Sequence, residues 1–156
     1  MQEKLKNLLL CIAIPVLTGS LSGFLTRGSM QVFRQLNKPP LSPPGAVFPI
    51  VWTILYILMG IASYLVFSSG AGQGDIRNAL SVYGLQLAVN FFWSLFFFNL
   101  GWYFFSFVWL VLLWLLILFT IRLFYPISRP AAYLLVPYLL WVTFAGYLNL
   151  GIAILN

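Results

Sequence analysis

The chain has 156 residues, of which 62% are hydrophobic and only 6% are charged. A soluble domain needs roughly 25% charged residues to cover its surface, so this composition excludes an ordinary soluble fold and indicates a lipid environment. Glu3 and Asp75 are the only acids, and the chain contains no histidine. The eight Lys and Arg residues lie at or between apolar runs, which favours anchoring at a membrane surface over binding of nucleic acid.

Five apolar segments are long enough to cross a bilayer, which takes about 20 mostly apolar residues. They lie at about 5–25, 46–67, 76–100, 102–124 and 131–155. We therefore predict an all-α membrane protein, a bundle of five transmembrane helices in a single domain over 1–156. The first segment has a second interpretation, because Lys4 and Lys6 before a short apolar core are typical of a cleavable signal peptide. Its apolar run continues to Leu25, which favours a retained helix.

The connections between these segments differ in stiffness. The longest, at 26–45, contains Lys38-Pro39-Pro40 and Pro43-Pro44-Gly45. Because proline fixes φ and restricts the residue before it, we expect a stiff, extended, non-helical lid-like loop. Asp75 is expected to cap the third helix, and Ser128 with Pro130 to begin the fifth. Pro15 and Pro137 fall inside spans, where each is expected to kink its helix.

The distribution of Lys and Arg predicts the orientation of the bundle. Five cations fall on the side of the N-terminus and three on the other side, which favours a cytoplasmic N-terminus in a bacterial cell membrane. The first group is Lys4, Lys6, Arg77, Arg122 and Arg129, and the second is Arg27, Arg34 and Lys38.

The inventory of reactive side chains excludes most conventional chemistry. Both acids lie outside the predicted spans, which disfavours a proton-coupled transporter and leaves no carboxylate pair for acid–base catalysis. No His/Cys/Asp/Glu cluster is present, so we predict neither a metal site nor a resident cofactor. Cys11 is the only cysteine and cannot form an intramolecular disulfide.

Three of the predicted helices carry a face that mixes aromatic with polar or small side chains. At 100° per residue, each of these faces covers an arc of about 60–80°. Amides are costly in hydrocarbon unless they find partners, so these faces are expected to point inward. Two interpretations remain open, namely interhelical packing and a ligand pocket lined by aromatic rings with a few polar groups. The faces consist of Trp52, Tyr56, Met59 and Ser63; Gln86, Asn90 and Trp93; and Tyr138, Trp141, Ala145 and Asn149.

Small residues form a second face on the third helix, opposite the polar one. Ser81, Gly84 and Ala88 fall within about 60° of arc, and small residues let helix backbones approach closely. We predict a helix contact here, between two protomers of a homodimer. Gly19 and Gly23 form a GxxxG motif on the first helix with the same meaning, although such motifs are common in membrane helices.

Three stretches of the sequence resemble a known family. They are Lys38-Pro39-Pro40-Leu41-Ser42-Pro43-Pro44 leading into Val51-Trp52-Thr53-Ile54-Leu55-Tyr56, then Leu85-Gln86-Leu87-Ala88-Val89-Asn90-Phe91-Phe92-Trp93, then Val136-Pro137-Tyr138-Leu139-Leu140-Trp141 through Ala145 and Leu148-Asn149. In this order they resemble the tryptophan-rich sensory protein/translocator protein (TspO/MBR, or peripheral benzodiazepine receptor) family. The resemblance implies a five-helix bundle, often dimeric, with a pocket below the first connection that binds porphyrins and benzodiazepine- and isoquinoline-type ligands.

The resemblance also implies which residues line the pocket. It carries over to Trp52, Asn90, Trp141 and Ala145, and to Phe33, where relatives often have tyrosine. Together with Phe48 and the inward faces, these give the predicted ligand-binding residues: Phe33, Phe48, Trp52, Tyr56, Gln86, Asn90, Trp93, Tyr138, Trp141 and Ala145. Animal members end the fifth helix with a sterol-recognition pattern, but Leu150 occupies its aromatic position and no cation follows, so the resemblance does not carry sterol binding over to this chain.

The leading functional prediction is a membrane receptor or sensor that binds a tetrapyrrole. A porphyrin offers a flat π-surface to Trp52 and Trp141, and its carboxylates could meet Arg27, Arg34 or Lys38 at the pocket mouth. Two alternatives remain. One is light-dependent degradation of porphyrin, in which Trp52 and Trp141 would be the oxidised residues. The other is passive porphyrin transport.

Overall fold

The computed structural model describes all 156 residues and contains helices but no strands. Five helical stretches are long and apolar enough to cross a membrane, which confirms the predicted class of an all-α, five-span membrane protein. The helices are α1 (Gln2–Thr26), the 3-10 turn η1 (Arg27–Ser29), α2 (Met30–Gln35), α3 (Val47–Phe67), α4 (Gln73–Ser94), the π-turn η2 (Leu95–Asn99), α5 (Tyr103–Phe124), α6 (Arg129–Leu134) and α7 (Val136–Leu155).

The outer surface of the helices is apolar, as a lipid-facing surface must be. Leu17, Val108 and Leu140 are each about two-thirds exposed, at 65%, 66% and 65%. The interior also contains apolar side chains, with Met59 and Leu113 fully buried, but it holds buried Gln and Asn residues as well. The amides lie inside the bundle, where they can find partners, because lipid cannot hydrogen-bond them.

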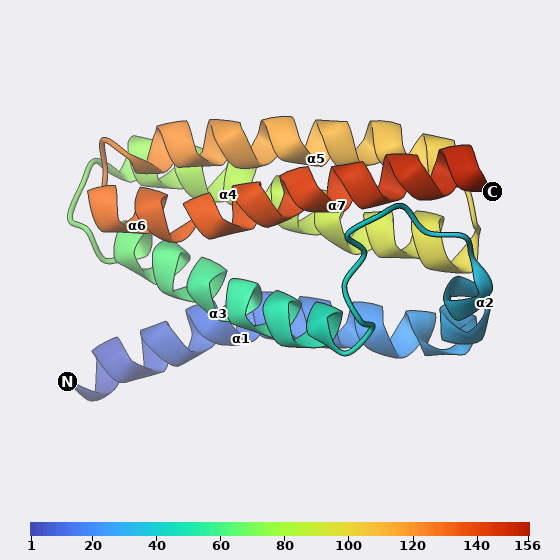
Figure 1. The fold of residues 1–156 in the computed structure, drawn as a ribbon. Helices are drawn as coiled ribbons and strands as arrows, with labels where there is room; N and C mark the ends of the chain where they lie inside the picture. The colour runs from blue at the N-terminus through green and yellow to red at the C-terminus, as the bar shows by residue number, and fades with distance from the viewer.

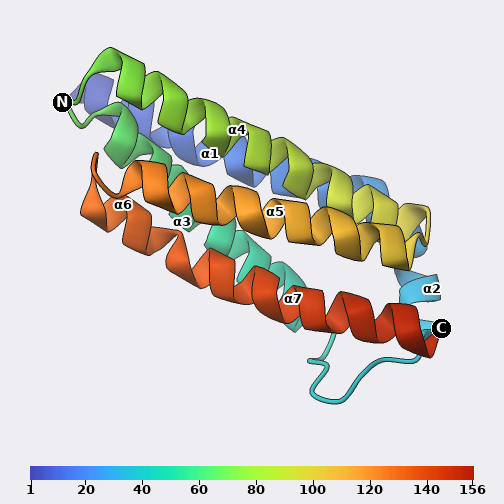
Figure 2. The same cartoon turned by 90° about the horizontal axis from the view of Figure 1, so that it is seen from above.

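The helices run lengthwise past one another, so that the chain's connections gather at two ends (Figure 1). α1 packs against α3, α4 against α5, and α5 against α7, as the view from above also shows (Figure 2). The N-terminus lies at one end together with the α3–α4 and α5–α6 connections, and the C-terminus lies at the other end beside α2. The candidate site lies toward this second end, where the long connection returns from α2 to α3.

The long connection differs from its prediction in its first half. We expected 26–45 to be non-helical, but η1 and α2 continue the helical chain as far as Gln35. The reason is visible in the sequence, since the stretch from Arg27 to Gln35 has no proline and the first proline is Pro39. Only the remainder is an irregular loop, in which Leu41 adopts a left-handed backbone with φ of 71°.

Of the two helix starts predicted from capping residues, the one at Asp75 is wrong and the one at Ser128 is confirmed. Asp75 was expected to cap the third spanning helix, and this is wrong, because α4 begins at Gln73 with Gly72 at the cap position. Asp75 lies in the first turn instead, where its charge still complements the helix dipole. Ser128 does begin the last spanning helix, since its side chain accepts a hydrogen bond from Ala131 N.

The two prolines within spans also behave differently. The last span is interrupted at Leu135 into α6 and α7, just before Pro137, as a helix-interior proline predicts. Pro15 lies buried within α1, which continues unbroken to Thr26.

Glycine allows α1 and α3 to approach closely at two points. A Cβ on Gly60 would meet the backbone of α1, lying 2.8 Å from Cys11 O. A Cβ on Gly19 would collide with the Tyr56 ring, whereas one on Gly23 would meet nothing within 4 Å. The Gly19 half of the GxxxG motif is therefore used inside one chain, against α3, and is not free for a second protomer.

Candidate functional site

A chain of hydrogen bonds links three helices at the centre of the bundle. The Tyr56 hydroxyl of α3 donates to Asn90 Oδ1 at 2.8 Å, and Asn90 Nδ2 of α4 donates to the Tyr138 hydroxyl at 2.7 Å. Tyr138 of α7 in turn donates to Gln86 Oε1 at 2.7 Å. Asn90 and Gln86 are one helical turn apart on α4, so both reach the same Tyr138. The predicted inward faces thus meet, with Tyr138 only 1% exposed.

A second polar link holds α4 and α5 to α7 nearer the loop. The indole N–H of Trp93 donates to Asn149 Oδ1 at 3.0 Å, and Asn149 Nδ2 donates to the Tyr103 carbonyl at 2.8 Å. Asn149, predicted to face inward, is therefore a structural link between helices, as the packing interpretation proposed.

Aromatic rings cover the polar chain on the side of the loop. The Trp52 ring stacks on Tyr56 with centroids 5.6 Å apart and meets the Tyr138 ring edge-on at 6.3 Å. Phe48, one turn before Trp52 on α3, meets the Trp141 ring at 5.9 Å. Trp52 and Trp141 are only half-buried, in contrast to the fully buried polar chain beneath them. The arrangement is an aromatic wall over a neutral hydrogen-bonded floor.

Phe33 of α2 connects the long connection to this wall. Its ring lies edge-on to Phe48 at 6.3 Å and to Phe98 at 5.3 Å, and a third contact reaches Phe97. The first connection is thereby joined both to α3 and to η2. Phe97 and Phe98 were absent from the predicted site, although Phe97 follows Trp93 by four residues, on the same helical face, which was a usable signal.

The irregular loop is held against α7 by three contacts, which we call the latch. Asn37 N donates to Asn156 Oδ1 at 3.1 Å and Asn156 Nδ2 donates back to Asn37 O at 2.8 Å. The Tyr147 hydroxyl donates to Pro40 O at 2.7 Å. Pro39 is buried against Gly151, where no Cβ would fit. Sequence reasoning missed these residues, because periodicity along a helix does not indicate which loop atoms it meets.

The three cations of the first connection lie in different surroundings. Lys38 Nζ donates to Arg34 O and to Leu36 O, both at 3.3 Å, and lies 4.8 Å from the centroid of the Phe33 ring. The Arg27 guanidinium lies over the Phe24 ring at 4.1 Å, and the Arg34 side chain is exposed. Lys38 is thus the one that reaches the site, through Phe33.

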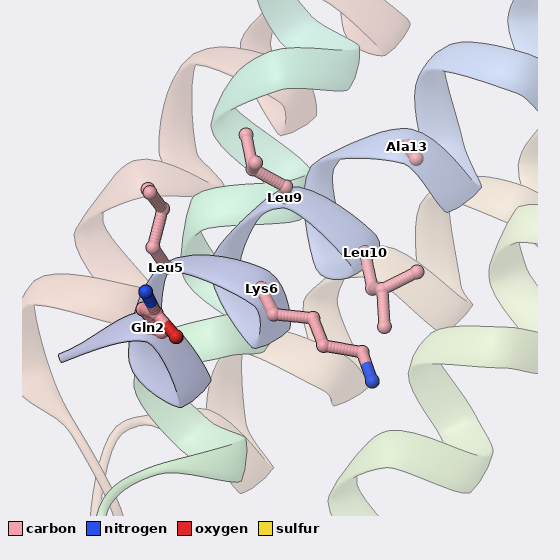
Figure 3. Close-up of a pocket in the computed structure, with 6 residues that line it drawn as sticks. All are labelled: Gln2, Leu5, Lys6, Leu9, Leu10 and Ala13. Atoms are coloured by element: carbon pink, nitrogen blue, oxygen red, sulfur yellow. The ribbon is translucent and has the colours of Figure 1, made fainter.

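Two open pockets on the surface of the bundle lie away from these residues. One, of about 450 Å³, is an open groove on the outer side of α1, lined by Gln2, Leu5, Lys6, Leu9, Leu10 and Ala13 (Figure 3). The other, of about 270 Å³, lies between α5 and α7 and includes Trp114, Thr143 and Tyr147. Both are lined mainly by apolar side chains on lipid-facing helices. Within the predicted site, the aromatic side chains contact one another instead.

The structure also locates the remaining predicted residues. Ala145 is buried at 7% exposure on the inward side of α7. Ser81, Gly84 and Ala88 are exposed on α4, and a Cβ on Gly84 would meet nothing within 4 Å. The predicted contact between protomers at this small-residue face stays a prediction.

The fold and the site together define the class of protein. It is a multi-pass helical membrane protein, with an aromatic wall and an amide–tyrosine floor beside a latched loop. Comparison with known proteins narrows this further. The profile of the TspO/MBR family matches residues 11–155, and the chain belongs to this family.

Individual relatives agree with that membership. The chain is 38% identical over 157 residues to the tryptophan-rich protein TspO of Chlorobaculum tepidum, covering 100% of this chain and 99% of the relative. It is 36% identical over 138 residues to the translocator protein of Bos taurus, covering 87% and 82%. It is also 38% identical over 125 residues to the tryptophan-rich sensory protein of Cereibacter sphaeroides, covering 80% and 76%.

Proposed function

We propose that the protein is a membrane receptor or sensor that binds a porphyrin, or a benzodiazepine- or isoquinoline-type ligand, at the aromatic wall. The observation that supports this most is the placement of Trp52 and Trp141 on facing helices, both half-buried above a floor of buried, neutral hydrogen-bonding groups. Flat aromatic ligands stack on such rings, and small-molecule sites combine apolar walls with a few polar groups. We also place the protein in the bacterial cell membrane with a cytoplasmic N-terminus.

Two groups around the wall can interact with polar or charged atoms of a ligand. The Trp141 indole N–H is shielded from solvent and has no hydrogen-bond partner, so it is available to an acceptor on the ligand. Lys38, held over Phe33, supplies a positive charge on the loop side of the wall. A ligand with a flat core and one or more carboxylates therefore matches the site better than a purely aliphatic one.

The same pair of indoles supports one alternative, light-dependent degradation of the porphyrin. With dissolved dioxygen as the oxidant, light absorbed by the porphyrin can oxidise indole side chains and open the macrocycle without the acids and bases that this interior lacks. A titration of purified protein with protoporphyrin IX, in the dark and then under light, tests both functions. Saturable binding with an unchanged absorption spectrum supports a receptor, and a new bilin-like chromophore under light supports the enzyme. Absence of saturable binding in the dark contradicts the proposed function.

A further inference from the structure

Two hydrogen-bond donors on the inward face of α4 have no partner. The Tyr83 hydroxyl belongs to a side chain that is 6% exposed, and Gln86 is 1% exposed. Gln86 Oε1 accepts from Tyr138, but its Nε2 donates to nothing. A buried polar group without a partner is costly, and more so within the span of a membrane helix, where water is scarce. Both donors therefore require an explanation.

The two donors belong to one place in the fold. They are three residues apart on α4, a spacing that puts side chains next to each other on the same face. The neighbouring hydroxyl of Ser63 donates to Gly60 O, and that of Tyr138 donates to Gln86. The Phe124 ring, with its centroid 6.0 Å from that of Tyr83, closes the site on the side of α5. Within the protein, neither Tyr83 Oη nor Gln86 Nε2 has an acceptor in hydrogen-bonding geometry.

We propose that Tyr83 Oη and Gln86 Nε2 together bind one neutral oxygen atom, one helical turn from Asn90 at the end of the hydrogen-bonded floor. An oxygen with two lone pairs can accept from both donors at once. A carboxylate is disfavoured, because no cation faces this position to balance a buried charge. In the ligand-free protein the oxygen is that of a buried water, and a carbonyl, ether or hydroxyl group of a ligand that reaches past Tyr138 can take its place. The water assignment is independent of the proposed function, and the ligand assignment rests on it.

A double-mutant cycle in ligand-free protein tests the shared oxygen. Tyr83→Phe removes only the hydroxyl, and Gln86→Met removes the amide at similar volume. If the oxygen is bound, Tyr83→Phe lowers the Tm in nanodiscs by about 2–4 °C, the size expected for one lost hydrogen bond. The double variant then loses less than the sum of the two single changes, because both remove the same bound oxygen. Ser106→Ala is the matched control, since Ser106 has a buried hydroxyl without a partner but no second such donor on α5.

If no oxygen is bound between the two donors, the variants should behave differently. If the two groups are simply unpaired, Tyr83→Phe leaves the Tm unchanged or raises it, as Ser106→Ala is expected to do, because an unsatisfied donor has been removed. That result, or additive changes in the double variant, overturns the proposal.

Water-edited solid-state NMR on protein labelled with 15N-glutamine identifies the source of the oxygen. In ligand-free proteoliposomes we expect magnetisation transfer from water to Gln86 Nε2, and its absence also overturns the proposal. Under a saturating isoquinoline carboxamide, whose amide carbonyl is a neutral acceptor, persistent transfer assigns the oxygen to water. Loss of transfer, with weaker binding of that ligand by Tyr83→Phe, assigns it to the ligand.

Discussion

At the scale of single residues, the site depends on a position that has no side chain. Gly19 leaves the space that the Tyr56 ring fills, and Tyr56 supports both the Trp52 ring and the Asn90 amide. We expect Gly19→Ala to destabilise the fold by about 1–3 kcal/mol, the usual cost of overpacking, and to weaken ligand binding through the displaced Trp52.

Gly23→Ala is the matched control, because it adds the same methyl group one turn away, where a Cβ meets nothing within 4 Å. Alanine is the better helix former by about 1 kcal/mol, so this variant should be as stable as the wild type or slightly more so. Thermal unfolding in detergent compares the two. Equal stability would show that α1 and α3 are not in the close contact described here.

Periodicity predicted which residues face inward, but not their partners. The 100° spacing placed Gln86, Asn90 and Tyr138 inside correctly, since amides in lipid must turn away from it. It could not indicate that Tyr138 bridges the two amides, because a bond between helices depends on their rotation and depth. Phe98 follows Trp93 by five residues and would be turned away from it on a regular helix. The π-turn η2 keeps them close, with centroids 6.0 Å apart.

At the scale of elements, the loop before α3 is tied to α7 rather than to α3. The latch predicts that α7 controls how long a ligand stays. We expect Tyr147→Phe combined with Asn156→Ala to speed ligand dissociation by about 10- to 100-fold, because three hydrogen bonds between loop and helix are lost, each contributing about 1 kcal/mol at most. Stopped-flow fluorescence measures the rate. Tyr133→Phe, an exposed tyrosine on α6 without a role in the latch, is the control. Unchanged dissociation would mean that the loop does not cover the site.

The small-residue face of α4 is the predicted contact between protomers. Ser81, Gly84 and Ala88 are exposed, and nothing in the chain approaches Gly84. If this face forms a protomer interface, Gly84→Leu should push the backbones apart and shift a dimer toward monomer. Gly74→Leu, at the exposed start of α4, controls for the added side chain. Crosslinking or light scattering in detergent measures the dimer fraction of each variant. An unchanged dimer fraction in Gly84→Leu would place the interface elsewhere.

The prediction of elements failed where local signals competed. Prolines marked the irregular loop well, but the proline-free stretch before it kept its helical preference and became η1 and α2. Asp75 is a good capping residue, yet the helix begins before it, since no proline or β-branched residue prevents Gln73 and Gly74 from joining the first turn. The start at Ser128 and the break before Pro137 had unambiguous signals and were predicted.

At the scale of the whole molecule, the three cations of the first connection give the loop end of the bundle its positive charge. If they attract ligand carboxylates, replacing Arg27, Arg34 and Lys38 by Gln should weaken protoporphyrin IX more than an uncharged aromatic ligand. The effect should be modest, less than about 1 kcal/mol per exposed pair, and should shrink with added salt. If the cations only anchor the loop to lipid headgroups, both affinities fall equally or not at all. Measuring both ligands side by side separates these roles.

The central claim is that the aromatic wall binds the porphyrin, and the most direct test is the affinity for protoporphyrin IX after removal of each indole. Trp52→Ala and Trp141→Ala should each weaken binding by roughly 2- to 10-fold or more, since a lost stacking contact costs about 0.5–1.5 kcal/mol beyond the lost area. Trp102→Ala, which removes a tryptophan that is 51% exposed and outside the wall, should leave the affinity unchanged. Wild-type affinity in a folded Trp52→Ala/Trp141→Ala double variant would contradict the assignment of this site.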